Sequence, residues 1–173
     1  MKILVAYASR MGSTAEIAER VGQQLREAGH DVDVSACSEA AEASSYEAVI
    51  LGSAIYLGRW DKAALGYLSG QADQLAGRPT WLFQSGPVGP GFELEHMVTP
   101  RAVRKLSDRC GLAPPVTFGG RLERTRAKTL LSRWISSGTY AGDFRDWDQV
   151  HEWTAAVVVE LAEGWRGAPL PAP

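Results

Sequence analysis

Continuous apolar runs that alternate with helical periodicity constrain this chain of 173 residues more than any other feature of its sequence. The runs are short and do not alternate with polar residues, which is typical of strands covered on both faces in a parallel sheet. Four runs are clear and a fifth is weaker: 3–8, 32–36, 48–52, 80–85 and 116–120. Because each parallel strand needs a crossover to reach its neighbour, the sequence predicts a doubly wound α/β fold.

Apolar residues at helical spacing fill the gaps between these runs. Ile17, Val21 and Leu25 predict a first helix that Gly29 closes. Further helices are expected after a cap at Asp61, from Pro100 as the first helical residue, and after a cap at Asp146. Their apolar stripes are Leu65 to Leu75, Val103 with Leu106, and Val150 to Leu161. No repeat or internal boundary interrupts the pattern, so we expect one domain over residues 1–163 and a flexible tail over 164–173.

Composition narrows the possible partners and the cellular location. The formal net charge is −2, which does not favour nucleic acid as a partner. No apolar stretch approaches the ~20 residues needed to span a bilayer, and the apolar N-terminus is too short for a signal peptide. Cys37 and Cys110 lie far apart, as reduced thiols of a cytosolic protein would. The sequence therefore predicts a soluble, cytoplasmic protein.

The segment after the first predicted strand has the composition of an anion-binding loop. Its hydroxyls and backbone N–H groups would surround an anion at the start of the first helix, where the helix dipole is favourable, and Gly12 permits a tight turn. The residues are Ser9, Arg10, Met11, Gly12, Ser13 and Thr14. The alternative is that Ser13 and Glu16 form only a capping box. The P-loop and dinucleotide-binding patterns are absent from the loop.

Two further loops are expected at the same edge of the sheet, because ligands of open parallel sheets bind beyond the carboxyl ends of the strands. The loop after the third strand carries an aromatic ring flanked by glycines, which suits stacking on a planar ligand. Its candidate residues are Ser53, Ala54, Ile55, Tyr56, Leu57 and Gly58, with Trp60 as a further flanking residue. The loop after the fourth strand is either a glycine-rich set of N–H donors or simply a flexible turn. Its candidates are Ser85, Gly86, Pro87, Val88 and Gly89 within residues 85–91.

The loop after the first predicted strand carries a family resemblance. Residues 7–14, Tyr-Ala-Ser-Arg-Met-Gly-Ser-Thr, resemble the phosphate loop of flavodoxins, and the Ser-Arg-x-Gly-x-Thr form resembles the flavodoxin-like menaquinone-dependent protoporphyrinogen IX dehydrogenases. Residues 52–58 are similar to the second flavin loop of that family, and residues 146–150 to the start of its last helix. The similarity extends over residues 1–162. It implies a five-stranded parallel sheet of order 2-1-3-4-5 with an insertion after the fifth strand.

The resemblance also implies a cofactor, flavin mononucleotide (FMN). Residues 9–14 would bind the FMN phosphate, and residues 53–58 and 85–91 would hold the isoalloxazine ring between them. Arg10 and Met11 stand where ordinary flavodoxins have two threonines, and Arg10 would add positive charge if it folds inward. Residues 53–58 and 85–91 contain no acidic side chain. This difference from ordinary flavodoxins favours two-electron chemistry.

The expected insertion spans residues 121–145 and separates enzymes from electron carriers in the dehydrogenase family. Its first part, residues 121–135, mixes five cations with apolar residues. Such a stretch either packs as a lid against the sheet or contacts a substrate, a quinone or the inner face of a membrane.

Three functions are compatible with these features. The first is an FMN-dependent oxidoreductase that resembles quinone-dependent protoporphyrinogen IX dehydrogenase, with a porphyrinogen-type substrate and a quinone acceptor. The second is a flavodoxin-like electron carrier that shuttles electrons between redox protein partners. The third is a flavin-free binding domain. His30, His96 and His151 have no metal-ligand spacing, so no metal is expected; only His96 is close enough to the third loop to act as a proton donor.

Overall fold

The computed structural model describes residues 1–86, 98–122 and 142–165. Five parallel strands form the central layer in the order β2-β1-β3-β5-β6. They are β1 (Lys2–Ala8), β2 (Asp31–Ala36), β3 (Ala48–Tyr56), β5 (Thr80–Gly86) and β6 (Val116–Gly119). The short strand β4 (Arg59–Trp60) pairs antiparallel with the end of β3. Counted over the parallel strands alone, this is the predicted order 2-1-3-4-5, and the α/β fold class is confirmed.

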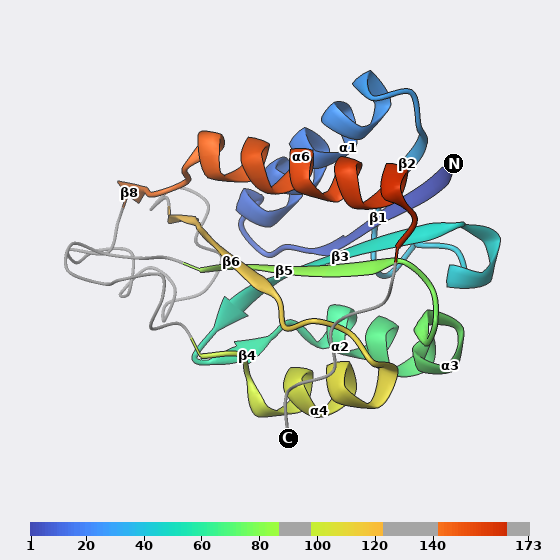
Figure 1. The fold of residues 1–173 in the computed structure, drawn as a ribbon. Helices are drawn as coiled ribbons and strands as arrows, with labels where there is room; N and C mark the ends of the chain where they lie inside the picture. The colour runs from blue at the N-terminus through green and yellow to red at the C-terminus, as the bar shows by residue number, and fades with distance from the viewer. Residues whose placement is uncertain (87–97, 123–141, 166–173) are drawn as a thin grey trace.

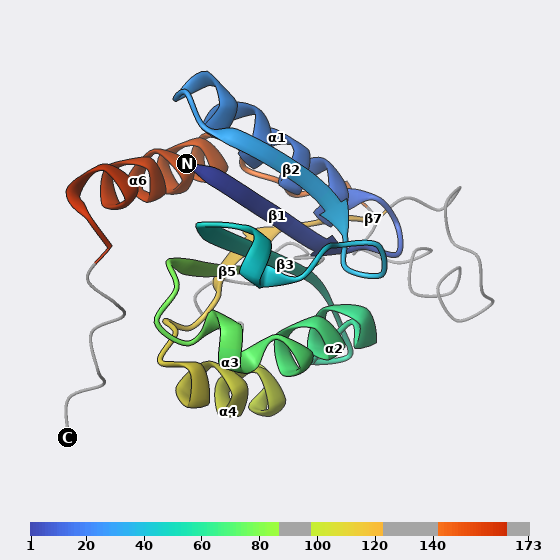
Figure 2. The ribbon, with the colours of Figure 1, turned by 90° about the vertical axis from the view of Figure 1, so that its right-hand side faces the viewer.

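Helices cover both faces of the sheet, as Figures 1 and 2 show. One face carries α1 (Ser13–Glu27) and α6 (Trp147–Glu163), and the other carries α2 (Lys62–Gly70), α3 (Ala72–Leu75) and α4 (Arg101–Cys110). A short 3-10 turn, η1, spans Ala43–Ser45. Ile3 and Val5 pack in the core under α1 and α6, whereas Leu4 and Ala6 belong to the opposite core. Since successive side chains of a strand point to opposite faces, burial of both faces produces the continuous apolar runs of the sequence.

Two predicted helix caps are confirmed. The Asp61 carboxylate accepts a hydrogen bond from the Ala63 N–H at 3.0 Å, and Asp146 accepts from Asp148 and Gln149 at 3.0 Å each. Pro100 is the N-cap of α4 and not its first helical residue, one position from the expectation.

The apolar stripe over residues 65–75 predicts one helix, but the structure has two helices there. The helix α2 ends at Gly70 and α3 begins at Ala72. At the break, the Gln71 side chain accepts a hydrogen bond from the Ala43 N–H of η1 at 2.9 Å.

Two predicted loops are wrong in part, because the strands before them are longer than their apolar runs. Ser53 and Ala54 continue β3 beyond its run and pair with Gln84 and Ser85 of β5, while β5 exceeds its run by Gly86 alone. Ile55 and Tyr56 pair with β4. Backbone pairing on both sides therefore keeps these small and polar residues in the sheet.

The expected insertion begins and ends on a two-residue ladder. The strands β7 (Arg121–Leu122) and β8 (Gly142–Asp143) pair antiparallel. Next to them the Phe144 N–H donates to the Gly120 carbonyl at 3.0 Å. Residues 123–141 between the two strands lie outside the described residues, as does most of the expected tail.

Two observations bear on the location and redox expectations. Cys37 and Cys110 are free thiols, and burial, chiefly, raises the pKa of Cys37 to about 12. Within the part of the chain that the structure describes, no helix has the length and apolarity to cross a membrane.

Candidate functional site

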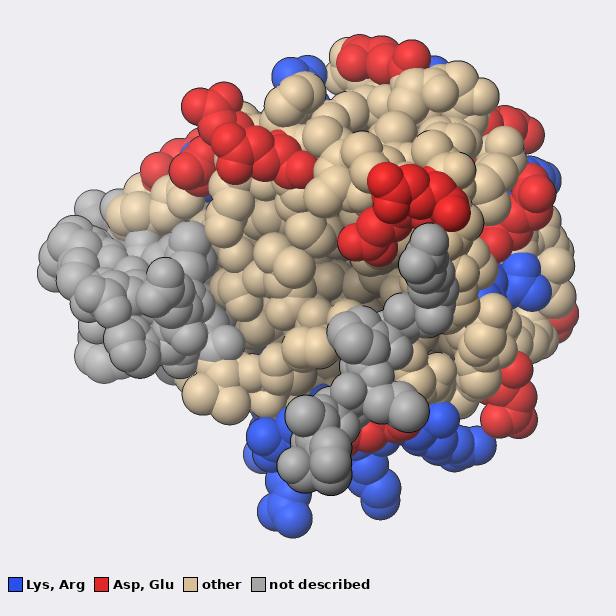
Figure 3. Space-filling view, in the orientation of Figure 1, with Lys and Arg blue, Asp and Glu red and all other residues tan. Residues whose placement is uncertain are grey.

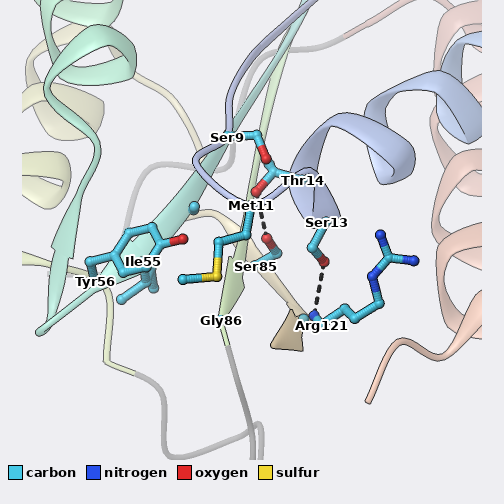
Figure 4. Close-up of a pocket in the computed structure, with 11 residues that line it drawn as sticks. Ser9, Met11, Ser13, Thr14, Ile55, Tyr56, Ser85, Gly86 and Arg121 are labelled. Carbon is cyan, nitrogen blue, oxygen red and sulfur yellow. Dashed lines mark hydrogen bonds between the residues drawn. The ribbon is translucent and has the colours of Figure 1, made fainter. Parts of the chain in front are cut away.

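The carboxyl ends of β1, β3 and β5 meet beside the start of α1, where they form a pocket (Figure 4). All three predicted segments contribute residues, so the expected convergence at one edge of the sheet is present. Figure 4 shows Met11 extending from the first loop toward Tyr56 and Ile55. The lining residues are Ser9, Met11, Ser13, Thr14, Ala54, Ile55, Tyr56, Ser85, Gly86, Gly120 and Arg121.

The first loop leaves the start of α1 open to a ligand. Gly12 is the N-cap residue at φ 90°, a left-handed conformation that favours glycine, and its N–H donates to the Ser9 hydroxyl at 3.0 Å. No described side chain accepts a hydrogen bond from the first N–H groups of α1. These N–H groups and the positive end of the helix dipole are the elements of an anion site.

The hydroxyl groups of the pocket have protons left for an anion. Ser13 accepts a hydrogen bond from the Arg121 backbone N–H at 3.0 Å, just as Ser9 accepts from Gly12. A hydroxyl that accepts one bond keeps its own O–H free to donate. The buried hydroxyls of Thr14 and Ser85 lie 2.8 Å apart, so one of the two protons joins them and the other is free. The donor set therefore fits a phosphate group.

The alternative interpretation, in which Ser13 and Glu16 form only a capping box, is wrong. Ser13 is the first residue of α1 rather than its cap, and the Glu16 carboxylate accepts hydrogen bonds from Arg121 and Arg145, each at 2.5 Å. Arg145 also pairs with Asp143 at 2.5 Å. These four residues form an ion-pair cluster that ties the first turn of α1 to both ends of the insertion.

The charges of this cluster shift the pKa values of both acids downward. Burial alone would raise the pKa of Glu16, but the hydrogen bond from Arg145 and the charge of Arg121 outweigh it. For Asp143 the hydrogen bond from Arg145 is the largest cause, and it keeps the pKa below the ordinary value.

Acidic pH is expected to break the ion pairs of this cluster. Because the folded-state pKa values of Glu16 and Asp143 are lowered, their stabilising contribution is complete above about pH 5 and is lost as the pH falls through the folded-state values. Urea unfolding of wild type and Glu16→Gln between neutral and acidic pH measures this directly. The difference in midpoint should shrink toward acidic pH, whereas Glu19→Gln, an exposed change on the same helix, should track the wild type. A difference that stays constant with pH would contradict the assignment.

Arg10 does not line the pocket, so the condition under which it would add positive charge there, that its side chain folds inward, is not met. Its Nε donates to the Asp61 carboxylate at 2.7 Å, and its guanidinium carbon lies 4.8 Å from the centroid of the Tyr56 ring. Burial, above all, raises the pKa of Tyr56, and Arg10 opposes that rise. Arg10 therefore holds Tyr56 and the start of α2 beside the first loop.

The remaining candidates occupy different places. Ser53 is fully buried, donates to the Ala54 carbonyl and accepts from the Asp61 N–H, so it braces the β3–β4 turn. Leu57 and Gly58 form that turn, both at positive φ, outside the pocket lining. Trp60 is buried and donates to Gln84 in the core; it does not line the pocket as expected for a flanking residue. Pro87, Val88, Gly89 and His96 lie outside the described residues.

Sequence reasoning missed two residues of the pocket lining. Gly120 and Arg121 follow β6 and line the pocket beside Ser13 of the first loop, whose hydroxyl accepts from the Arg121 N–H. Arg121 carried a signal, since it begins the basic stretch of the insertion, but its link to Ser13 and Glu16 joins residues more than a hundred positions apart. Among the described residues no cluster of His, Cys, Asp or Glu could hold a metal ion.

Comparison with known proteins gives a family match and several similar folds. The flavodoxin domain model matches residues 4–127. No curated protein matches the chain. A flavodoxin from the domain Archaea is 18% identical with a TM-score of 0.61, over 94% of this chain and 97% of its own. Flavodoxin 1 from Bacillus cereus is 18% identical with a TM-score of 0.61, over 92% and 98%.

A domain of a larger protein is similar to the same degree. The rubredoxin oxygen:oxidoreductase of Desulfovibrio gigas is 16% identical with a TM-score of 0.61, over 94% of this chain and 36% of its own. At these identities the solved structures establish the fold alone.

Proposed function

This chain belongs to the flavodoxin-domain family, and on that premise we propose that it is an FMN-dependent oxidoreductase. FMN is the cofactor that follows from the family, and a redox role follows from FMN. The observation that carries the proposal is the pocket at the start of α1, where free N–H groups, hydroxyl protons and an aromatic ring lie together.

The residues present fit the two ends of FMN. Ser9, Ser13 and Thr14, together with the first N–H groups of α1, would hold the phosphate. Tyr56 and the segment from Ser85 to Gly86 would lie against the isoalloxazine ring. When bound, the flavin supplies the capacity to accept and release electrons. The contribution of the chain is to bind and orient it.

At a finer level, we propose that the chain oxidises a reduced, porphyrinogen-type substrate and passes the electrons to a quinone. The support is the family resemblance of the first loop and the position of the insertion, whose two ends are fixed beside the pocket by Arg121 and Arg145. A cytoplasmic location, with contact between residues 121–135 and a membrane surface, belongs to this finer proposal.

An electron carrier that shuttles between redox proteins is the second candidate. It is supported by the flavodoxins that match 92–94% of this chain over 97–98% of their own length. In a carrier, the exposed edge of the flavin would serve protein partners instead of a small substrate.

Purified protein loaded with FMN tests the proposal and separates its two forms. Flavin absorption bands that stay with the protein through gel filtration are expected. Protoporphyrinogen IX oxidation that depends on an added naphthoquinone supports the enzyme. Two separate one-electron steps in a redox titration, without turnover, support the carrier. Colourless protein that fails to bind added FMN would contradict both the enzyme and the carrier proposal.

A further inference from the structure

A second cavity lies between the β4–α2 segment and α4, on the opposite side of the β3–β4 turn from the FMN pocket. It encloses about 660 Å³, a volume within the range of binding sites. Four cations line it: Arg59 and Lys62 on one wall, and Arg101 and Lys105 on the other. We call this cavity the basic groove.

The cations of the basic groove have no ion-pair partner in the described part of the fold. All four residues are exposed, and among the residues that the structure describes no carboxylate forms an ion pair with any of them. Figure 3 shows Lys and Arg gathered along the lower edge of the molecule, where Figure 1 places α4. The chain as a whole is slightly acidic, so this positive region is a local feature.

Apolar surface accompanies the charge. The apolar part of the groove lining consists of the half-buried Leu65 and the buried Trp60 and Pro100. Two of the few large apolar side chains that the described surface exposes lie in sequence beside lining residues: Leu57, next to Gly58, is 84% exposed, and Val98, two residues before Pro100, is 77% exposed. The groove and its neighbours in sequence thus combine charged and apolar residues, as protein interfaces do.

The groove adjoins the FMN pocket through a single turn. Tyr56 lines the pocket and Gly58 lines the groove, and only Leu57 separates them in the chain. A protein seated in the groove would therefore lie beside the flavin.

We propose that the basic groove is the docking surface for a small acidic electron-transfer protein. This inference rests on the redox part of the proposed function and assigns the class of partner. Complementary charge would steer the partner to the groove, and the exposed apolar side chains would bury against it. Each encounter moves one electron, so two reduced partner molecules and two protons from water reduce one bound FMN to its dihydro form.

Equilibrium binding of oxidised plant-type ferredoxin, an acidic [2Fe–2S] protein, tests docking without any electron transfer. Binding to the full chain at low ionic strength is expected, with an affinity that falls as salt is added. The variants Arg101→Gln/Lys105→Gln and Arg59→Gln/Lys62→Gln, one on each wall, should each weaken binding roughly tenfold. The control Arg104→Gln/Arg109→Gln removes the same charge from α4 outside the groove lining and should change affinity less than about twofold.

Equal losses in the groove and control variants, or no salt-sensitive binding, would overturn the proposal. Binding to vesicles that contain phosphatidylserine, but not to ferredoxin, would overturn it in favour of a membrane surface. Because the measurement works equally on protein without flavin, a failure to load FMN would count against the proposed function and leave the docking result intact.

Discussion

Replacing Gly119 by alanine is expected to lower the free energy of unfolding by about 3 kcal/mol or more, at or above the upper end of overpacking effects. An added Cβ would lie far inside contact distance of the Phe144 carbonyl oxygen. The obstacle is backbone that returns from the insertion, so it cannot turn away as a flexible side chain does. Relief requires β6 or the segment after β8 to move, and that movement would displace Gly120 and Arg121 from the pocket.

Gly66→Ala is the matched control. Gly66 lies within α2, and nothing lies within 4 Å of the added Cβ. Alanine there should increase stability by about 0.5–1 kcal/mol, because glycine is a poor helix former. Urea unfolding followed by circular dichroism measures both changes. Loss of less than 1 kcal/mol for Gly119→Ala would show that the segment after β8 yields easily and is not firmly packed against β6.

Thr14→Val is expected to weaken FMN binding by roughly 10- to 100-fold, the range for removing one hydrogen bond to a charged group. The substitution preserves the shape of a side chain that is almost completely buried, and it removes the hydroxyl that shares a proton with Ser85. Riboflavin lacks the phosphate, so its affinity should change less than about threefold. The contrast between the two flavins isolates the phosphate contact.

Thr154→Val tests whether the effect is local. Thr154 is also fully buried, but its hydroxyl donates to the Val150 carbonyl within α6. FMN affinity should be unchanged in this variant, as measured by quenching of flavin fluorescence. Equal losses of FMN and riboflavin in Thr14→Val would place the phosphate elsewhere, whatever the outcome of the control.

Local and periodic features of the sequence predicted most of the fold. Runs such as residues 3–8 are apolar on both faces because both faces are covered, and Asp61 and Asp146 cap helices within three residues of themselves. The end of β3 was harder to predict, since Ser53 has the composition of a loop residue. Its place in the strand depends on pairing between distant segments.

In the candidate site, too, local features could be predicted from the sequence and contacts between distant residues could not. The loop of residues 9–14 could be located from its own composition and resemblance. The partner of Glu16 could not, because a Ser-x-x-Glu pattern is satisfied locally in many helices and here two arginines of the insertion take the carboxylate instead. Arg10 likewise pairs with Asp61, which lies 51 residues away, and not with the pocket beside it.

The ladder of β7 and β8 gives the fold a point at which new sequence can be accommodated. Leu122 and Gly142, the described residues on either side of 123–141, are paired on neighbouring strands. The entropic cost of closing a loop between two paired ends grows only with the logarithm of its length, so segments of different size and composition can be exchanged at such a place without repacking the core. A carrier could thus evolve into an enzyme, or an enzyme into a carrier, by replacing one segment beside the cofactor, while the cofactor site and the core are inherited unchanged.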